Sequence, residues 1–475
     1  MSLWSLVVVV LVAVACTKPN PRSCQDGTCT DPALPFCDID GALAGEEQTC
    51  IAVACTANEF VACRGDRAIT CNTTGTDYEL ELCSGGCSEA AGGCRRCEPN
   101  ETVCENGQVQ TCDSDGAVIA SEVCPLGCFE DQPRCREIDP SNNLGRYVDM
   151  VPAPQDLDLS GTLIITNTGV VELQGNAVAG IAHFLQPAAG NGAAIRVIVA
   201  RDVRLADVTF ATSSGSGPSL AILATGSLII SGRVTGLPGA GAMETIGCSG
   251  GAGESEIAGG SYHYAGHGGG GHATPGAKGG DIPNRGLFGG GGGIVSGTDN
   301  LVPLRGGCGS GRTSARGGSA LQLSSRKSVV VDGVVDLRGA PQGGGGGGGL
   351  LIEAPVVELK ANARLLATGG GGHGGGHFAD QYSVPPRTDD GGPDLGTACM
   401  PSTSSCTPGG NGAAPGVPAT PGTNTSSSQT LMEIGAGGGG GGLGRIRINT
   451  PNQIYIKTSS VIEAGVTTVG TLSSR

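Results

Sequence analysis

Short runs in which apolar and polar residues alternate recur along the chain downstream of about residue 150. The clearest example spans residues 321–359, where alternating segments stand on both sides of a run of seven glycines at 343–349. A period of two predicts β-strands, because successive side chains of a strand point to opposite faces. A repeated unit of about twenty residues cannot bury its own apolar face, so the pattern indicates units that stack on one another.

Five such units begin at residues 195, 220, 321, 350 and 446. Each reads as strand, turn and strand, and apolar residues recur at offsets of zero, two, eight and ten in four of the five. The pattern predicts an all-β fold, a parallel β-solenoid (β-helix) built from short strands. The side chains predicted to point inward are, unit by unit, Ile195, Val197, Val203, Leu205 and Val208; Leu220, Ile222, Leu228, Ile230 and Val234; Leu321, Leu323, Val329, Val331 and Val335; Leu350, Ile352, Val357, Leu359 and Leu365; and Ile446, Ile448, Ile454, Ile456 and Val461.

The connections between the units differ greatly in length. Successive units start 25, 101, 29 and 96 residues apart, so two connections are short and two are long. All four leave after the last strand of a unit. This places the long glycine-rich insertions, at 237–318 and 369–444, on one side of the solenoid. In repeat proteins that side is often the binding face.

The insertions carry repeated glycine runs in a chain with 87 glycines and only 3% aromatic residues. One interpretation is disorder, because glycine loses much entropy when it is fixed and buries no side chain. The other is ordered packing, in which extended threefold helices lie close together and share hydrogen bonds, as glycine permits in collagen. Each insertion also holds two cysteines, Cys248 with Cys308 and Cys399 with Cys406. A disulfide in each would staple the loop, which favours order.

The segment before the solenoid is rich in cysteine, with sixteen cysteines from Cys24 to Cys135. Twelve of them form two groups of six, Cys55 to Cys94 and Cys97 to Cys135. From the second cysteine onward, successive cysteines in both groups are separated by 7, 11, 3 and 6 residues. Cysteine at this density in an exported chain indicates disulfides, although six cysteines permit fifteen pairings. Asn or Asp and Gly after each third cysteine predict a turn between two short strands, so each module is expected to be a stapled hairpin.

The predicted organisation is a signal peptide at 1–15, a tether and four-cysteine module at 16–52, six-cysteine modules at 53–96 and 97–136, a linker or the approach to a cap at 137–157, and the solenoid at 158–475. Cys94 and Cys97 form a CxxC that zinc could use, but they straddle two modules and no histidine lies in the region. The disulfide candidates are Cys24, Cys29, Cys37, Cys50, Cys55, Cys63, Cys71, Cys83, Cys87, Cys94, Cys97, Cys104, Cys112, Cys124, Cys128, Cys135, Cys248, Cys308, Cys399 and Cys406.

The first sixteen residues contain an apolar run that is too short to span a bilayer and that ends in Ala13, Val14, Ala15 and Cys16. Small residues before a cysteine resemble the bacterial lipoprotein box, in which Cys16 becomes the lipidated first residue. An ordinary secretory signal cleaved nearby is the alternative. Thr17, in place of an aspartate, resembles outer-membrane sorting. We therefore expect an exported protein at the outer membrane or cell surface, held by one acylated terminus.

Charge and histidine placement bear on partners and cofactors. A formal charge of −15 argues against nucleic acid or anionic lipid as the main partner. The two insertions emerge on one side, so their histidines could meet and bind zinc or copper. The alternative is solvated histidines on flexible loops, which the lack of neighbouring Asp or Glu ligands favours, and no cofactor is expected. The histidines concerned are His263, His267, His272, His373 and His377.

Fragments of the insertions resemble motifs of β-helical enzymes that act on pectin-like polysaccharides, namely the tripeptides at 266–268 and 445–447 and the pair Asp389 and Asp390. Their order differs from that of the enzymes, and they are predicted in loops rather than on adjacent strands. Glycoside hydrolysis requires two carboxyl groups at a fixed separation across one bond. The pattern therefore favours a protein without enzymatic activity.

Several motifs together resemble a family. A lipoprotein box at Cys16, tandem modules that read TCNTTG and TCDSDG, and the segments LAILATGSLIISGRVTG, GGCGSG and GGSALQL are similar to the uncharacterised glycine-rich surface lipoproteins of myxobacteria and their relatives. The resemblance implies this architecture and no activity. The glycine-run insertions also resemble the receptor-binding tips of some phage tail fibres, in which packed polyglycine helices display variable loops.

The leading functional expectation is a cell-surface lipoprotein whose glycine-rich loops bind another surface, through a glycan or a protein. Tyr262 and Tyr264, in the segment SYHYAGH, are the predicted ligand contacts, because aromatic side chains stand out of a glycine background there. A spacer or coat protein without a specific ligand is the alternative. An enzyme that acts on envelope polysaccharide is the third possibility.

Overall fold

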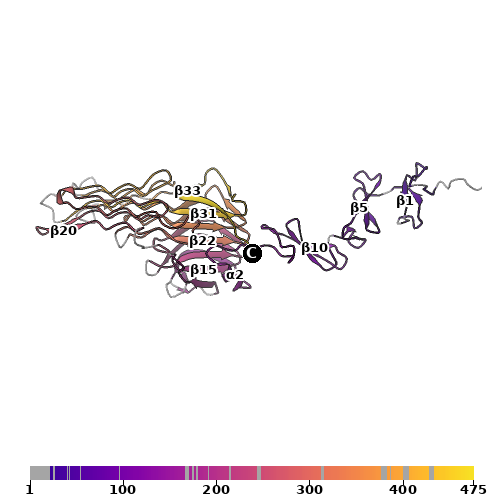
Figure 1. Cartoon of the computed structure of the whole chain (residues 1–475), viewed down its shortest axis with the longest axis horizontal. Coiled ribbons are helices and arrows are strands. Elements are labelled where there is room, and N and C mark those ends of the chain that lie inside the picture. Colours follow the sequence, from indigo (N-terminus) through magenta and orange to yellow (C-terminus); the bar gives the residue numbers. More distant parts are fainter. Residues whose placement is uncertain are drawn as a thin grey trace, which may run out of the picture. The chain divides into compact units, whose positions relative to one another are not determined.

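The computed structural model describes residues 22–475, with gaps at 25–26, 40, 42, 54, 96, 166–170, 174–175, 178–179, 191, 213–215, 243–247, 312–314, 376–381, 384, 386, 400–405 and 427–432. The predicted signal peptide and Cys16 lie outside the described residues. The chain is nearly all β and divides into two compact units, Met1–Arg136 and Glu137–Arg475 (Figure 1). Each unit is described below by itself.

The first unit consists of small antiparallel sheets. Their strands are β1 (Phe36–Asp38), β2 (Thr49–Ile51), β3 (Phe60–Arg64), β4 (Arg67–Cys71), β5 (Tyr78–Leu82), β6 (Cys87–Ser88), β7 (Gly93–Cys94), β8 (Thr102–Glu105), β9 (Gln108–Cys112) and β10 (Val118–Val123). The predicted turns lie between β4 and β5 and between β9 and β10. In both, the side-chain oxygen of the first residue, Asn72 or Asp113, accepts hydrogen bonds from the amides two and four residues later. The predicted hairpins are therefore confirmed.

Disulfides staple each module in the same way. The two six-cysteine modules pair the first cysteine with the third, the second with the fifth and the fourth with the sixth, so the structure selects one of the fifteen possible pairings. Cys94 and Cys97 belong to different disulfides, and the zinc interpretation of the CxxC is wrong. The pairs in this unit are Cys24–Cys37, Cys29–Cys50, Cys55–Cys71, Cys63–Cys87, Cys83–Cys94, Cys97–Cys112, Cys104–Cys128 and Cys124–Cys135.

The second unit is built around a curled, mostly parallel sheet. One side has seven strands in the order β14 (Ala182–Gln186), β15 (Ile195–Ala200), β17 (Ser219–Ala224), β22 (Ala320–Ser325), β25 (Gly349–Glu353), β31 (Arg445–Thr450) and β34 (Val466–Thr471). Every neighbouring pair is parallel except β14 with β15. Leu220, Leu321, Leu350 and Ile446 stand in one register, as the spacing of the units predicts.

On the other side of the curl, most of the sequence repeats contribute two strands each. The sequence pattern had predicted one strand per repeat there. One row is β18 (Ser227–Ile230), β23 (Ser328–Val331), β26 (Val356–Leu359) and β32 (Ile456–Lys457). The second row is β19 (Arg233–Gly236), β24 (Val334–Asp336), β27 (Arg364–Leu366) and β33 (Ile462–Ala464). The long strand β16 (Val203–Thr212) pairs with both rows. Strands β11 (Leu157–Ile165), β12 (Val171–Leu173) and β13 (Asn176–Ala177) follow beyond β16.

All three rows enclose one apolar core. Every inward position predicted for the units that start at 220, 321 and 350 belongs to this core. The units are narrow and their core residues are aliphatic, with Phe210 as the one buried ring in this cluster. Stacked aliphatic rows are therefore what holds the parallel sheet together.

The prediction for the first strand of the repeat that starts at residue 195 was wrong by one residue, whereas Val203, Leu205 and Val208 of the same repeat lie in the core as predicted. Arg196, not Ile195, aligns with Leu220 on the next strand. Consequently Ile195 and Val197 lie in a separate apolar cluster on the outer face, while Ile198 faces the main core. The whole of β15 is buried, so its sequence lacks the alternation that would have fixed the register.

In the repeat that starts at residue 446, two of the side chains predicted to point inward do not do so. Ile454 and Ile456 are 67% and 60% exposed, whereas Tyr455 packs against the core. Ile456 aligns with Glu358, whose side of β26 faces away from the core. Val461 is partly buried against the core, as predicted. The exposed isoleucines therefore lie where the stack ends.

The segment 137–157 is not a free linker, because it packs on the seven-stranded side of the sheet. Leu144 and Tyr147, at the start of and within helix α2 (Gly145–Asp149), are buried against the outer face of the seven-stranded side. Ser141 Oγ donates to Glu353 Oε1 over 2.6 Å, and Asn142 Nδ2 donates to Gln322 Oε1 over 2.9 Å. Apolar packing and hydrogen bonds therefore hold this segment on the outer face of the sheet.

Candidate functional site

The described parts of the glycine-rich connections are ordered and lie together. They leave after β19, β24 and β27, which is the same point of each unit, and they run side by side (Figure 1). The name glycine lattice is used here for residues 248–253, 265–280, 289–293, 305–311, 339–348, 369–375, 408–413, 420–425 and 436–444. The described glycine runs are hydrogen-bonded and mostly buried, so the disorder interpretation is wrong for them.

Hydrogen bonds in the lattice recur every third residue. Amides 437 and 440 donate to segment 420–423, amides 438 and 441 to segment 370–373, and amides 439 and 442 to segment 267–270. A chain whose successive amides point to three different neighbours has a threefold axis, as an extended helix of three residues per turn does. The ordered interpretation of the glycine runs is therefore confirmed.

Glycine is required because the segments are in backbone contact. A Cβ on Gly269 would lie 2.0 Å from Gly440 O, and one on Gly440 would lie 1.8 Å from Asn411 O. The disulfide Cys248–Cys308 staples the first insertion, as predicted. The predicted partner of Cys406 is Cys399, whose side chain lies outside the described residues; Cys406 itself is disulfide-bonded.

A small sheet carries the two predicted tyrosines. It consists of β20 (Ser255–Ala258), β21 (Ser261–Tyr264) and β30 (Glu433–Gly435), which come from both insertions. Tyr262 and Tyr264 alternate with buried His263, so both rings lie on one face. They are 46% and 40% exposed, their planes differ by 3°, and their centroids are 6.2 Å apart. Ile257, directly opposite Tyr262, is 69% exposed.

The apolar cluster of this region fixes the orientation of the sheet. Buried Ala265, Ile282, Leu287, Ile434 and Ala436 form it. These residues come from both insertions, so the cluster joins them independently of the main core. The tyrosine-bearing face is therefore attached to a packed support rather than to a free loop.

A cavity of about 250 Å³ lies beside this sheet. Tyr264, His267 and Ser310 from the first insertion and His373 from the second line it, and the other described residues of its lining are glycines and alanines. The carbonyls of His267 and His373 accept hydrogen bonds from the adjacent amides of Gly439 and Gly438. The lattice segment 436–444 is thus hydrogen-bonded to both histidine residues at the cavity.

The other histidines do not join this pair. His263 is 1% exposed, and His272 is fully buried with its Nδ1 2.8 Å from Gly347 O. Burial, followed by the charge of Arg445, lowers the pKa of His272 to about 3. His377 lies outside the described residues. The interpretation of solvated histidines is therefore wrong for His263 and His272.

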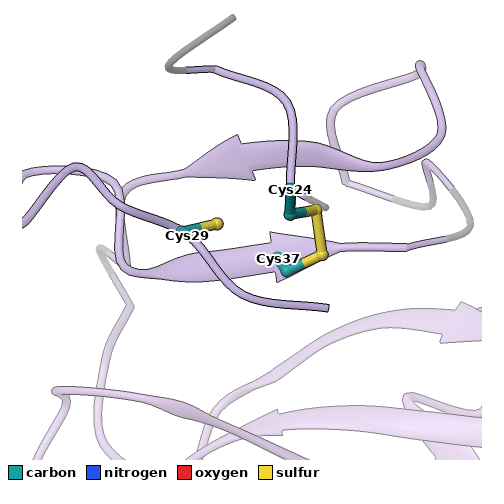
Figure 2. A group of neighbouring side chains, drawn as sticks. All are labelled: Cys24, Cys29 and Cys37. Atoms are coloured by element: carbon teal, nitrogen blue, oxygen red, sulfur yellow. A yellow bond between two sulfur atoms is a disulfide. The ribbon is translucent and has the colours of Figure 1, made fainter. Parts of the chain in front are cut away.

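Within the described ranges, only Cys24, Cys29 and Cys37 have the spacing of a metal site among histidine, cysteine and acidic residues. Figure 2 shows Cys29 beside the disulfide between Cys24 and Cys37. Cys29 is itself bonded to Cys50. Because all of these sulfur atoms are in disulfides, none is a thiolate ligand.

Asp389, one of the two residues that resembled a hydrolase motif, belongs to a network of ion pairs. It contacts Arg233 and Arg338, and Arg338 also contacts Asp336 at 2.6 Å and Asp394 at 3.4 Å. These contacts attach the second insertion to β19 and to the segment that follows β24. The sequence gives no sign of this network, because its members are up to 161 positions apart, from 233 to 394.

Comparison of the chain with protein-family models, with curated proteins and with solved structures found no match. In the part of the chain that the structure describes, no helix is long and apolar enough to cross a bilayer.

Proposed function

We propose that the chain is an exported surface lipoprotein, one of the family that it resembles, whose glycine lattice presents a recognition tip to another surface. The observation that carries the proposal is the pair of exposed, parallel tyrosines on β21. Exposed aromatic rings cost little conformational entropy on binding and bury a large area. Surface apolar groups that gather on a packed support are typical of interaction sites.

We also propose that the curled parallel sheet is a β-solenoid. Supporting this, the same three rows of strands recur in register through successive units. A solenoid suits the proposed role, because it lets several connections leave from one side and pack together. The tip then gains its rigidity from the lattice and not from a large globular core.

The anchor is proposed from the sequence ending at Cys16. Replacing the acylated residue by Cys16→Ser should abolish incorporation of labelled fatty acid and move the protein from the membrane fraction to the soluble fraction. The same change tests the alternative of an ordinary secretory signal, under which fractionation and labelling would not change.

Recognition is tested by binding of the full chain, made soluble by Cys16→Ser, to whole cells and envelope material. The double variant Tyr262→Ala/Tyr264→Ala should lose most of the binding. Phe288→Ala is a matched control, since Phe288 is an aromatic residue of the same insertion with 62% exposure. Equal binding by the wild type and the double variant, or none by either, would leave the spacer role as the better account.

A further inference from the structure

We propose that the chain forms a symmetric dimer through the edge strand β34, which pairs antiparallel with β34 of a second copy. β34 is one edge of the seven-stranded side of the curled sheet, and among the described strands it pairs only with β31. An unpaired strand edge presents main-chain donors and acceptors that another strand can take. The inference concerns the second unit and does not depend on the recognition role of the tip.

The open edge of β34 follows from its hydrogen bonds to β31. The amides of Val466 and Leu472 donate to Gly444 O and Thr450 O, at the two ends of β31. In a parallel pair, residues that bond to the neighbouring strand alternate with residues whose main-chain groups point the other way. Residues 467, 469 and 471 therefore point away from β31, and no described residue forms a main-chain hydrogen bond with them.

The chain that follows β34 does not cover this edge. Arg475 contacts Asp149 at 2.6 Å, and Asp149 is also 3.9 Å from Arg326, which follows β22. β22 lies three strands away from β34 in the sheet. The segment after Thr471 thus folds back across the seven-stranded side, and the edge of β34 stays accessible.

β34 lacks the features with which proteins usually protect strand edges. Its sequence, VTTVGT, has no charged residue and no proline, and no bulge interrupts its register with β31. Lysine, proline and bulges are common protection against pairing with another chain. Val469 is 40% exposed although it aligns with Ile448, which lies in the main core. Apolar surface is therefore open to solvent at this edge.

An antiparallel pair centred on Val469 uses every outward main-chain group of the strand. Residue 469 then stands opposite residue 469 of the second copy, and residues 467 and 471 stand opposite each other in both directions. Each of these three pairs can exchange two main-chain hydrogen bonds, which gives about six in all. The two Val469 side chains meet at the twofold axis and cover each other. The edge is thus complementary to itself.

The charges beside the strand match the same register. Arg447 lies over Gly470, where an added Cβ would meet its guanidinium. Thr468 Oγ1 donates to Asp299 O over 3.2 Å, and the side chain of Asp299 stays 76% exposed although it contacts Arg445. In the proposed pair, Gly470 stands opposite Thr468 of the second copy. Each Arg447 therefore comes next to Asp299 of the other copy, so opposite charges meet on both sides of the axis.

The opposite edge strand of this side, β14, is the other strand that β34 of a second copy could meet. Pairing of β34 with β14 leaves one unpaired edge at each end, so it produces an open filament. Pairing of β34 with β34 closes at two copies, as the twofold interfaces of most soluble oligomers do. The twofold pair is therefore the closed arrangement that this edge permits.

The test is analytical ultracentrifugation of the full chain, made soluble by Cys16→Ser, over a range of concentrations. We expect a reversible equilibrium of monomer and dimer, with slower hydrogen exchange of segment 466–472 in the dimer. Val469→Pro removes an outward amide and no bond to β31, so it should raise the dissociation constant of the dimer at least about tenfold.

Val469→Asp places two carboxylates at the axis and should weaken the dimer to a similar extent. Val356→Asp is the matched control, because Val356 is a valine of β26 with 44% exposure, and it should change the dissociation constant less than about threefold. Arg447→Asp and Asp299→Arg should each weaken the dimer about threefold or more, and the double variant should recover most of the loss. Thermal unfolding of each variant identifies any loss that is due to misfolding.

Three results would overturn the proposal: a chain that stays monomeric at all concentrations, a dimer without protection of segment 466–472, or a dimer that Val469→Pro and Val469→Asp leave unchanged. Assembly beyond two copies would overturn it in favour of pairing between β34 and β14. Binding of cells by the tip is measured separately, so failure of the dimer leaves the recognition role standing.

Discussion

At the scale of single residues, glycines of the lattice differ in what a side chain would meet. A Cβ added to Gly269 would lie 2.0 Å from the carbonyl oxygen of Gly440, whereas a Cβ added to Gly291 would have no neighbour within 4 Å. The glycine composition alone does not reveal this difference. Two substitutions to alanine, identical in chemistry, are therefore expected to have opposite effects.

Gly269→Ala should lower the free energy of unfolding by at least about 2 kcal/mol, because backbone would have to move away from the new methyl group. Gly291→Ala should be neutral or stabilise by up to about 1 kcal/mol, because alanine restricts the unfolded chain. Denaturant unfolding and limited proteolysis of the insertions measure both. Equal destabilisation by the two variants would contradict the close packing seen at Gly269.

His272 is a residue whose charge state is fixed by burial. In the unfolded chain its imidazole takes up a proton near pH 6.5, whereas in the fold it stays neutral until about pH 3. Between these values the unfolded state binds the extra proton. The contribution of neutral His272 to the free energy of unfolding is therefore complete above pH 6.5 and is lost as the pH falls.

The free energy of unfolding should thus drop by about 1.4 kcal/mol per pH unit below pH 6.5, or about 2 kcal/mol between pH 6.5 and pH 5. His272→Gln, which does not titrate, should remove this part of the acid sensitivity. Measuring the free energy of unfolding of the wild type and of the variant at several pH values tests this prediction. Parallel pH profiles for the two proteins would show that His272 is not the group responsible.

At the scale of elements, ion pairs attach the second insertion to the curled sheet. The side chain of Arg338 is 4% exposed, and those of Asp336 and Asp394 are 10% and 5% exposed. Burial opposes ionisation of Asp336, but the hydrogen bonds and charge of Arg338 hold its pKa below the ordinary value. Burial raises the pKa of Asp394 in spite of Arg387. Arg338 is therefore the buried cation that contacts both carboxylates, while Arg233 also contacts Asp336 and Arg387 also contacts Asp394.

Arg338→Ala should destabilise the second unit by about 3 kcal/mol, because the buried carboxylates of Asp336 and Asp394 then keep only the more exposed Arg233 and Arg387 as partners. Arg201→Ala is the control: its pair with Asp156 has side chains 61% and 52% exposed, so solvent screens the charges and the free energy of unfolding should change little. Unfolding curves and the rate of proteolysis within residues 369–444 report the difference. A small effect of Arg338→Ala would mean that the lattice alone holds the insertion.

At the scale of the whole molecule, the two units are stabilised by different means. In the first unit most of the buried apolar residues are cysteines, whereas the second has a continuous aliphatic core. Closing loops of 11 to 24 residues limits the freedom of the unfolded first unit. Among the described disulfides, only Cys248–Cys308 belongs to the second unit.

Reduction should consequently unfold the first unit and leave the curled sheet intact. We expect rapid hydrogen exchange and proteolysis up to about residue 136 after treatment with a reductant, with protection retained in β17, β22 and β25. The double variant Cys248→Ser/Cys308→Ser serves as the control for the second unit. Loss of protection in those strands on reduction would show that the units depend on one another.

The sequence predicted the architecture well where apolar residues of a strand alternate with polar ones. Leu321, Leu323 and Val329 alternate with polar residues, and they lie in the core in the predicted register. It predicted less well where apolar residues stand on both faces of a strand, as in β15, or where the stack ends, as at Ile456. In those places periodicity carries no information on which side faces the core.

The candidate site was only partly predictable for a related reason. Tyr262 and Tyr264 stand out because aromatic residues are rare in this chain. The meeting of His267 with His373 depends on which lattice segments are neighbours, and a run of identical glycines does not specify its register. The ion pairs of Arg338 likewise depend on the path of the second insertion. Contacts set by glycine packing are therefore visible only in the structure.

The close packing of the lattice also limits how its gene can change. Every amino acid that a single base change can produce from a glycine codon has at least a Cβ, which many lattice positions, such as Gly269, cannot hold. Most lattice codons should therefore tolerate only silent changes. The codons of exposed tip residues, such as Tyr262 and Ile257, carry no such restriction. Selection can thus diversify the tip while the scaffold beneath it stays constant.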